Sequence, residues 1–134
     1  MNILSKKNRK SISKLLNSLS KPARVQILLA IGEDEACVCH LESVLGYRQA
    51  YISQHLMALR AAGILETRRD GRFIFYKLRD KRILGLIQNA GAIAGIPDRD
   101  LRPVKNIEKI PGCNCPSCQP LIQIEPFTDQ FEVS

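Results

Sequence analysis

Aromatic residues are scarce in this sequence, and tryptophan is missing altogether. Aromatic residues make up only 5% of the 134 positions, so the core must be mainly aliphatic, which suits a helical protein. No apolar run approaches the roughly 18 residues that a membrane-spanning helix requires. The N-terminus carries basic residues without the apolar stretch of a secretory signal, so we expect a cytoplasmic protein with no membrane partner.

The chain contains five cysteines and no secretory signal to accompany them. An odd number of thiols without an export signal argues against a disulfide framework and favours a reducing compartment, where thiols stay reduced or bind metal. The sequence contains no nucleophile–base–orienter set, no phosphate-binding glycine loop and no catalytic zinc spacing. We therefore expect a binding protein rather than an enzyme.

Acidic residues are absent from positions 1–32, which carry seven Lys or Arg. A second basic stretch, residues 60–82, contains eight Lys or Arg against three acidic residues. The net charge is +7 and the sequence pI is about 9.4, which favours a polyanionic partner such as DNA. Basic charge alone is weak evidence for DNA binding. It supports DNA binding only where it lies beside an element that can read DNA.

Apolar residues at helical spacing predict five helices. The first has four apolar residues at i, i+3, i+4 and i+7, starting at Ile12. Pro22 suits the first turn of the second helix, and Gly63 stands where a glycine commonly ends a helix, after the fourth. The predicted ranges are 10–20, 22–31, 36–42 closing near Gly46, 48–62 and 80–94.

Two strand-like runs, residues 64–69 and 72–78, follow the fourth helix. Asp-Gly joins them at positions 70 and 71, and this dipeptide between such runs is a strong hairpin signal. Six of the seven prolines come after residue 96. The predicted fold class is mainly α with a small β-hairpin, a winged helix-turn-helix domain in residues 1–96, followed by a Pro-rich, Cys-containing tail in residues 97–134.

The fourth helix has the two faces that a DNA-recognition helix needs. Ile52, Leu56 and Leu59 form its inner face, and polar side chains occupy the remaining surface. Arg can pair with guanine and Gln with adenine in the major groove, whereas Ser and His suit phosphates. The candidate DNA-binding residues are Arg48, Gln49, Tyr51, Ser53, Gln54 and His55 on the helix, and Arg68, Arg69 and Arg72 on the hairpin.

Two simpler interpretations are open at this point. The polar residues could be only the solvated face of an amphipathic helix, although the hairpin and its basic tip agree with DNA binding. His55 could equally pack inside the domain, or bridge helix and hairpin by a hydrogen bond, instead of contacting a phosphate.

Several spaced motifs resemble the ArsR/SmtB family of metal-sensing repressors. They lie in order within residues 10–95: LSKPAR at 19–24, CVCHL at 37–41, ISQHL at 52–56, LRAAGIL at 59–65, and the hairpin at 69–78. The resemblance implies a homodimer formed through the first and last helices, which binds an inverted-repeat operator. It also implies that a bound metal or metalloid weakens DNA binding and releases transcription of efflux or detoxification genes.

Cys37 and Cys39 stand at the start of the helix that precedes the recognition helix. On a regular helix their side chains would point about 200° apart, since each residue turns ~100°. They converge only if Cys37 is still extended or the first turn is distorted, so a helix N-terminus is where this pair can chelate an ion. The helix dipole there also favours the thiolate, the metal-binding form. The alternative is two buried cysteines that act as small apolar residues.

Three further cysteines, Cys113, Cys115 and Cys118, lie within six residues of the tail. A polar, Pro-rich segment offers no core for them, and exposed thiols at this density favour metal binding over redox or incidental use. Thiolates select soft ions such as As(III), Sb(III), Cd(II), Pb(II) and Zn(II). In the family, a Cys-x-Cys pair in this helix resembles the arsenic and cadmium/lead sensing site, so the resemblance makes Cys37 and Cys39 ligands.

The chain departs from the family pattern in three places. The third cysteine of the arsenic sensors is replaced by Glu42, the N-terminal arm has no Cys, and residues 80–95 have no His for a zinc site. The missing ligands are therefore expected from the tail cysteines, within one protomer or across the dimer. His40 is expected to face solvent or cap the helix, and the choice between As(III)/Sb(III) and Cd(II)/Pb(II)/Zn(II) stays open.

Two other functions fit the same scaffold. One is a redox- or persulfide-sensing repressor, in which Cys37 or Cys39 forms a disulfide with the tail. The other is a DNA-binding protein whose thiols hold structural zinc, so that stripping the metal unfolds it.

Overall fold

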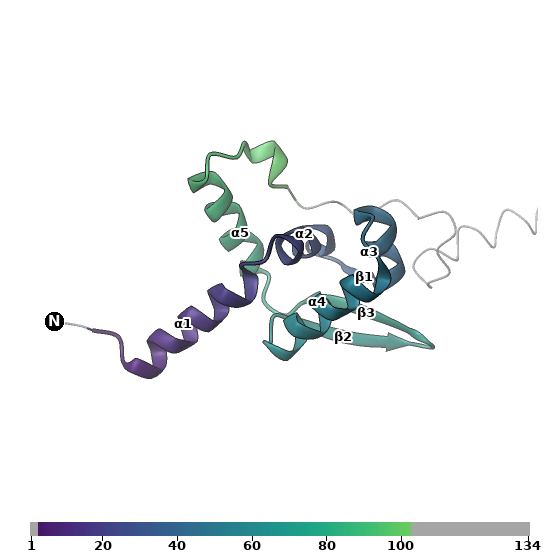
Figure 1. Cartoon of the computed structure of the whole chain (residues 1–134), viewed down its shortest axis with the longest axis horizontal. Helices are drawn as coiled ribbons and strands as arrows, with labels where there is room; N and C mark the ends of the chain where they lie inside the picture. The colour runs from purple at the N-terminus through teal and green to yellow at the C-terminus, as the bar shows by residue number, and fades with distance from the viewer. Residues whose placement is uncertain (1–2, 103–134) are drawn as a thin grey trace, which may run out of the picture.

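The computed structural model describes residues 3–102, which form helices around a small sheet (Figure 1). The elements are α1 (Lys6–Leu19), α2 (Pro22–Ile31), β1 (Glu35–Cys37), α3 (Val38–Leu45), α4 (Gln49–Ala61), β2 (Leu65–Asp70), β3 (Phe73–Leu78), α5 (Arg82–Ile93) and the 3-10 helix η1 (Asp98–Asp100). Helices α3 and α4 followed by the β2–β3 hairpin, the wing, form the winged helix-turn-helix, so the predicted fold class is confirmed. None of the helices in the described part is long and apolar enough to span a membrane.

An aliphatic core joins α2, α3 and α4, as the shortage of aromatic residues predicts. The largest side chains with almost no exposed surface are Ile27, Leu28, Ile31, Leu41, Ile52, Leu56, Leu59 and Phe75. Three of them, Ile52, Leu56 and Leu59, are the predicted inner face of α4, which is thereby confirmed. Full burial of such a side chain stabilises the fold by about 1.5–3 kcal/mol, so α4 is held with its opposite face outward.

The sheet has three antiparallel strands in the order β1–β3–β2. Residue 36 was expected to begin a helix, and this is wrong. Ala36 lies opposite Tyr76 in the sheet, and α3 begins only at Val38. A three-residue strand that is held by a partner far away in the sequence leaves no periodicity of its own to recognise.

Strand β3 is apolar on both faces. Ile74, Tyr76 and Leu78 pack on the main core, whereas Phe73 and Phe75 belong to the opposite face, because successive side chains of a strand alternate. The strand is therefore covered on two sides, which makes it the centre of the sheet in packing as well as in topology.

The hairpin turns at Gly71-Arg72, one residue later than predicted. Asp70 pairs with Phe73, so it is the last residue of β2 rather than part of the turn. Gly71 has a φ of 62°, which glycine adopts without a Cβ clash. Glycine at the first position of a two-residue loop is typical of a type II′ hairpin turn.

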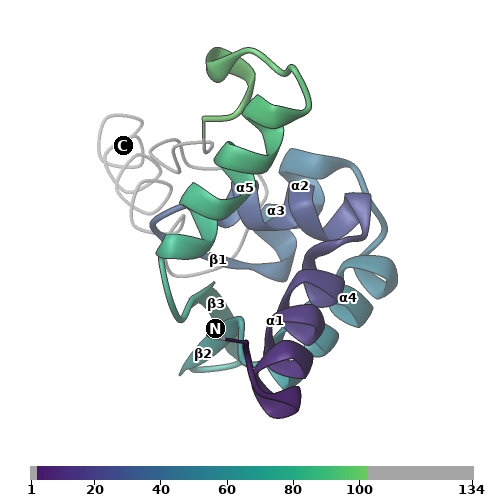
Figure 2. The ribbon, with the colours of Figure 1, turned by 90° about the vertical axis from the view of Figure 1, so that its left-hand side faces the viewer.

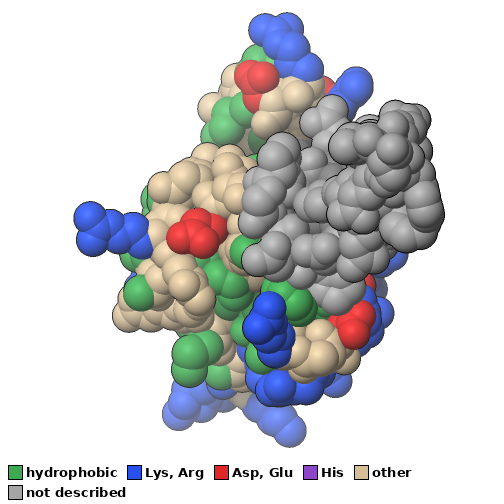
Figure 3. All heavy atoms as spheres, turned by 90° about the vertical axis from the view of Figure 1, so that its right-hand side faces the viewer, with side chains coloured by type: hydrophobic (Ala, Val, Ile, Leu, Met, Phe, Trp, Pro, Cys, Tyr) green, Lys and Arg blue, Asp and Glu red, His purple; other side chains and the backbone are tan. Residues whose placement is uncertain are grey.

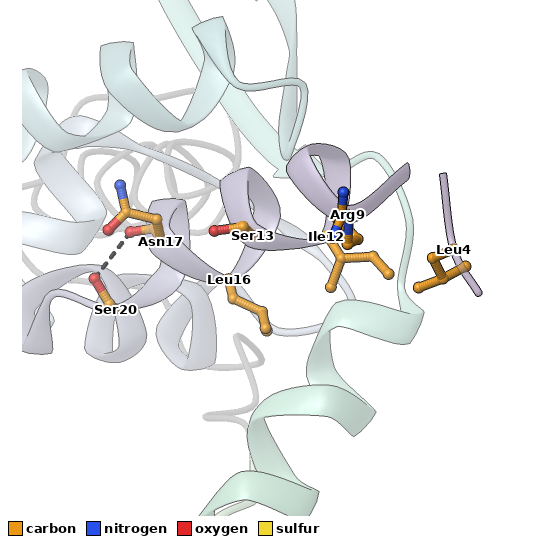
Figure 4. A pocket seen from close by; sticks show the side chains of 7 residues that line it. All are labelled: Leu4, Arg9, Ile12, Ser13, Leu16, Asn17 and Ser20. Carbon is orange, nitrogen blue, oxygen red and sulfur yellow. Dashed lines mark hydrogen bonds between the residues drawn. The ribbon is translucent and has the colours of Figure 1, made fainter. Parts of the chain in front are cut away.

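Helix α1 projects from the rest of the domain (Figures 1 and 2), and Leu19 is the buried residue among its fourteen. Ile12 and Leu16 are about half exposed, and they line a shallow apolar pocket together with Leu4 (Figure 4). On α5, Ile93 is 88% exposed. The two helices at the ends of the domain therefore leave apolar surface uncovered in one chain.

The folded region continues past residue 96, where the sequence analysis places the domain boundary. After η1, Leu101 is 6% exposed and lies against Gly91 of α5. The Gln88 side-chain amide donates to the carbonyl oxygen of Leu101 at 3.2 Å. This contact fastens the segment that follows α5 back onto that helix.

Candidate nucleic-acid interface and thiol pair

Helix α4 turns polar side chains outward, as predicted. Arg48 precedes its first residue in an extended conformation, with φ −69° and ψ 149°. Gln49, Tyr51 and Gln54 are exposed, and Ser53 is partly exposed. Side chains near the N-terminal end of such a helix contact base edges when the helix lies in the major groove. The structure thus brings five of the six candidate residues of the helix to its outer surface.

His55, the sixth candidate, lies inside the domain. It is 7% exposed, its Nδ1 accepts a hydrogen bond from Arg24 Nε at 3.1 Å, and Tyr51 meets its ring edge to face at 4.7 Å. Burial, and then the positive charges of Arg24 and Lys21, lower the pKa of His55 from its ordinary value of 6.5. The ring is therefore neutral near pH 7, and this placement favours packing over a phosphate contact.

Arg24, which the sequence analysis did not select, connects three helices. Besides its bond to His55 of α4, it donates through a terminal nitrogen to the Ser18 carbonyl oxygen of α1 at 3.1 Å. Tyr47, just before α4, donates its hydroxyl to Gln26 Oε1 of α2 at 2.5 Å. These polar contacts hold α4 in a fixed position relative to α1 and α2.

Arg68 is engaged by its own chain. It donates to both carboxylate oxygens of Glu35, from Nε at 3.2 Å and from a terminal nitrogen. Its guanidinium also lies 4.6 Å from the centre of the Phe75 ring, a cation–π distance. The hydrogen bond to Glu35 raises the pKa of Arg68 above its ordinary value, so the guanidinium stays charged.

Arg69 and Arg72 are exposed near the tip of the hairpin. The Arg72 guanidinium lies 5.5 Å from the Phe73 ring centre. Figure 3 views the molecule from the side to which the hairpin tip points, and Lys and Arg side chains gather over the lower part of this face. A basic wing beside an outward-facing helix suits the phosphate backbone of DNA.

Cys37 and Cys39 converge where β1 meets α3. Cys37 precedes the first residue of α3 and is extended, with φ −89° and ψ 168°, which is the condition for the two side chains to meet. Their Sγ atoms are 2.7 Å apart. Two thiolates on one tetrahedral ion stand about 3.8 Å apart, from Zn–S bonds of ~2.3 Å, whereas a disulfide measures ~2.05 Å. The two side chains are therefore close enough to act on one ion together, and no disulfide joins them.

The thiol pair packs on the wing. Cys37 and Phe75 form a small buried cluster, and Cys39 and Phe73 pack against it. Cys37 lies directly opposite Phe75, and Phe75 lies directly opposite Arg68. Opposite residues of antiparallel strands share a face, so Cys37, Phe75 and Arg68 form one row across the sheet, which we call the cross-strand row.

The ligand set of the thiol pair is incomplete within residues 3–102. No group of three or more His, Cys, Asp and Glu side chains in this described part could hold a metal ion. His40 is 8% exposed, so the expectation that it faces solvent is wrong: α3 turns His40 toward the domain. The predicted tail ligands Cys113, Cys115 and Cys118 lie outside the described residues. Two soft thiolates fit a thiophilic ion, which needs one or two more.

Comparison with known proteins places these features in a family. Residues 21–67 match the family described as "Bacterial regulatory protein, arsR family". The chain is 37% identical over 95 residues to the biofilm growth-associated repressor of Agrobacterium fabrum, an alignment that covers 71% of this chain and 81% of that protein. The chain belongs to the ArsR family.

Two further relatives extend this comparison. The ArsR-family chain is 32% identical over 88 residues to the cadmium resistance transcriptional regulatory protein CadC homolog of Staphylococcus aureus, covering 65% of this chain and 73% of that protein. It also matches the crystal structure of the transcriptional repressor BigR from Xylella fastidiosa, with a TM-score of 0.60, 35% identity, and coverage of 66% and 90%. The ArsR family consists of DNA-binding transcriptional regulators, so the expectations of DNA binding and of no enzymatic activity are confirmed.

Besides Arg24, the sequence analysis missed Phe75 and Glu35 of this ArsR-family site. For Phe75 a signal exists, because the unbroken apolar run 73–76 is typical of a strand covered on both faces. For Glu35 there is none, since Arg68 lies 33 positions away and their ion pair forms only when β1 joins the sheet.

Proposed function

We propose that this ArsR-family protein is a metal(loid)-responsive transcriptional repressor that works in the cytoplasm. The ion-free homodimer binds an operator and leaves it when a thiophilic ion, As(III)/Sb(III) or Cd(II)/Pb(II)/Zn(II), binds cysteine thiolates. The observation that carries this proposal is the convergence of Cys37 and Cys39, whose Sγ atoms are 2.7 Å apart. The pair lies at the start of α3, the helix that precedes the recognition helix α4.

In this proposal α4 lies in the major groove and the wing lies along the phosphate backbone. The outward polar side chains of α4 and the exposed arginines of the wing support this placement. Arg68 and His55 hold the protein surface in shape rather than contact DNA, because both are engaged within the chain. The proposed DNA contacts are Arg48, Gln49, Tyr51, Ser53, Gln54, Arg69 and Arg72.

The homodimer in this proposal forms through α1 and α5. Ile12 and Leu16 of α1 are 48% and 49% exposed, and Ile93 of α5 is 88% exposed. Large apolar side chains exposed on both helices of a monomer favour an interaction site there. A second copy of the chain is the occupant that fits, since a two-fold dimer presents two α4 helices to the two halves of an inverted repeat.

Cys37 and Cys39 supply two thiolate ligands, and the tail cysteines Cys113, Cys115 and Cys118 supply the rest. Two thiolates alone do not complete the three- or four-thiolate set of such an ion, so this proposal assigns the other ligands to the tail. Three thiolates suit trivalent arsenic, whereas four suit Cd(II), Pb(II) or Zn(II). The cadmium-resistance name of one relative supports the second group without deciding between them.

An operator-release titration tests this function. A duplex selected from a random pool by the ion-free protein serves as operator, and As(III), Cd(II), Pb(II) and Zn(II) are added in parallel under strictly reducing conditions. Wild type should be released by one or more of these ions. Cys37→Ser and Cys39→Ser should bind the operator as wild type does and resist release.

Two further variants test DNA binding and ion sensing separately. Arg48→Ala should weaken operator binding while the ion stoichiometry stays unchanged. Replacing the three tail cysteines with serine should leave operator binding intact and weaken or abolish release by the ion that releases wild type. Undiminished release of both Cys37→Ser and Cys39→Ser by the wild-type inducer refutes the assignment of the sensing site.

A redox-responsive repressor is the second candidate, and the short Sγ–Sγ distance favours it. Two thiols would lose two electrons and two protons to a peroxide, which is reduced to water, and one S–S bond would form. This candidate predicts release by peroxide and none by ions under reducing conditions. Structural zinc predicts instead that a chelator unfolds the protein, whereas a sensor stays folded and binds DNA without metal.

A further inference from the structure

The cross-strand row connects the thiol pair to the wing. We propose that Glu35 and Arg68 are positioning residues that transmit the occupancy of the thiol pair to the wing, with Phe75 between them. This inference rests on the proposed function and specifies how the same site regulates DNA binding. It assigns Arg68, whose side chain is 50% exposed, a positioning role within its own chain instead of a contact with the operator.

The geometry gives two routes from β1 to Arg68. The first runs through the cross-strand row, in which Cys37 lies opposite Phe75 and Phe75 lies opposite Arg68. The second is the ion pair of Arg68 with Glu35, which is two residues before Cys37 on the same strand and the same sheet face. A displacement of β1 therefore reaches Arg68 both directly and through the Phe75 ring.

Ion binding fixes the geometry of the thiol pair. A tetrahedral ion that binds both thiolates holds their Sγ atoms about 3.8 Å apart, and the pair packs on a buried neighbour. Phe75, against which Cys37 packs, is 1% exposed, and a close-packed interior transmits strain because it has no void to absorb it. Phe75 therefore has to shift when Cys37 does.

Arg68 is well placed to pass such a shift to the hairpin tip. It lies three residues before the turn, its guanidinium stacks on Phe75 at 4.6 Å, and a terminal nitrogen is 3.8 Å from the Asp70 carboxylate. Loss of the stacking and of the Glu35 pair would remove side-chain contacts that hold the end of β2 carrying Arg69, while its backbone pairing with β3 remains. In this way the thiol pair controls the shape of the wing without touching DNA.

Glu35→Gln tests the inference, and Glu66→Gln is its matched control. Both variants remove one acidic charge beside Lys77 in the same sheet, since Lys77 lies opposite both residues. Glu66 pairs with Lys77 at 3.6 Å, whereas Glu35 pairs with Arg68. Operator affinity of the full chain is measured with and without Cd(II) or As(III), whichever releases wild type, and ion stoichiometry is measured in parallel.

Allosteric coupling typically changes an affinity about 5- to 150-fold. The ion should therefore weaken operator binding by a factor in this range in wild type and in Glu66→Gln. In Glu35→Gln it should weaken operator binding only about twofold. Ion stoichiometry should be the same in all three proteins. Arg68→Lys keeps the charge but not the two-pronged hydrogen bond, and it should also lose most of the coupling.

A second readout needs no ion. The Arg68 Nε–H proton should be protected from solvent exchange in ion-free wild type and Glu66→Gln, and unprotected in Glu35→Gln. If wild type is released by an ion and Glu35→Gln is released equally, the inference is wrong while the proposed function stands. If no ion releases wild type, the proposed function fails and the inference fails with it.

Discussion

Replacing Gly91 with alanine tests how the segment after α5 is held. A Cβ at this position would lie 2.4 Å from Leu101 Cδ2 and 2.8 Å from its Cδ1, so the alanine fits only when the Leu101 side chain shifts away from α5. Losing the burial of that leucine costs about 1.5–3 kcal/mol, and alanine in a helix gains about 1 kcal/mol over glycine. The expected net destabilisation is about 0.5–2 kcal/mol, the difference of these two contributions.

Gly85→Ala is the matched control on the same helix. A Cβ at Gly85 has no other atom within 4 Å, so this variant should be stabilised by up to about 1 kcal/mol. In a Leu101→Ala background the clash is gone, and Gly91→Ala should then stabilise the protein by a similar amount. The sign of the Gly91 effect therefore depends on Leu101.

Urea unfolding of the full chain, followed by far-UV circular dichroism at one fixed protein concentration, measures these differences. A fixed concentration is needed because association shifts the apparent stability. The reasoning is refuted if Gly91→Ala stabilises the otherwise unchanged protein as much as Gly85→Ala does. It is also refuted if Gly91→Ala destabilises equally with and without Leu101.

Two pH-dependent predictions concern the groups with shifted pKa values. Because the pKa of His55 is lowered in the folded state, the unfolded chain binds a proton there more readily than the folded chain does. The free energy of unfolding should therefore fall as the pH drops below about 6.5. Arg24→Gln should raise the His55 pKa in an NMR titration and reduce this fall. The hydrogen bonds from Arg82 lower the pKa of Asp80 from 3.8 to about 2, a shift that stabilises the fold above the ordinary pKa and is lost as the pH falls to about 2. Asp80→Asn should therefore melt at a lower temperature than wild type at pH 7, and thermal melts should show this difference disappearing near pH 2.

The helical part of the fold was predictable because its signals are local. The apolar positions Ile52, Leu56 and Leu59 repeat at helical spacing, and all three are buried in α4. A helix that packs one face on a core must expose the other, so the outward surface of α4 follows from the same pattern.

Long-range pairing explains what the sequence did not reveal. Strand β1 exists because Ala36 lies opposite Tyr76, and nothing in three residues distinguishes that strand from a helix start. The register of β2 with β3 likewise moved the turn to Gly71-Arg72, although Asp-Gly is the stronger local turn signal.

For the functional side chains too, local sequence signals identified residue types, whereas long-range contacts decided their roles. Residue type identified His55 as a hydrogen-bonding group, but only the packing of α2 against α4 decides that Arg24 satisfies it inside the domain. Arg68 looks like a DNA contact in the sequence, and its partner Glu35 becomes visible only in the assembled sheet. The two cysteines were identified from their spacing, but the extended Cys37 that lets them converge belongs to β1 and depends on the same long-range pairing.

The most direct test of the central claim measures ion binding and operator release in one sample. The ion-free protein is held on a fluorescent operator duplex under strictly reducing conditions, and Cd(II) or As(III) is added while thiolate charge-transfer absorption and fluorescence anisotropy are recorded together. The proposed function predicts that absorption rises and anisotropy falls with the same stoichiometry in wild type, and that Cys37→Ser shows neither change. Saturating thiolate absorption with the operator still fully bound would contradict it.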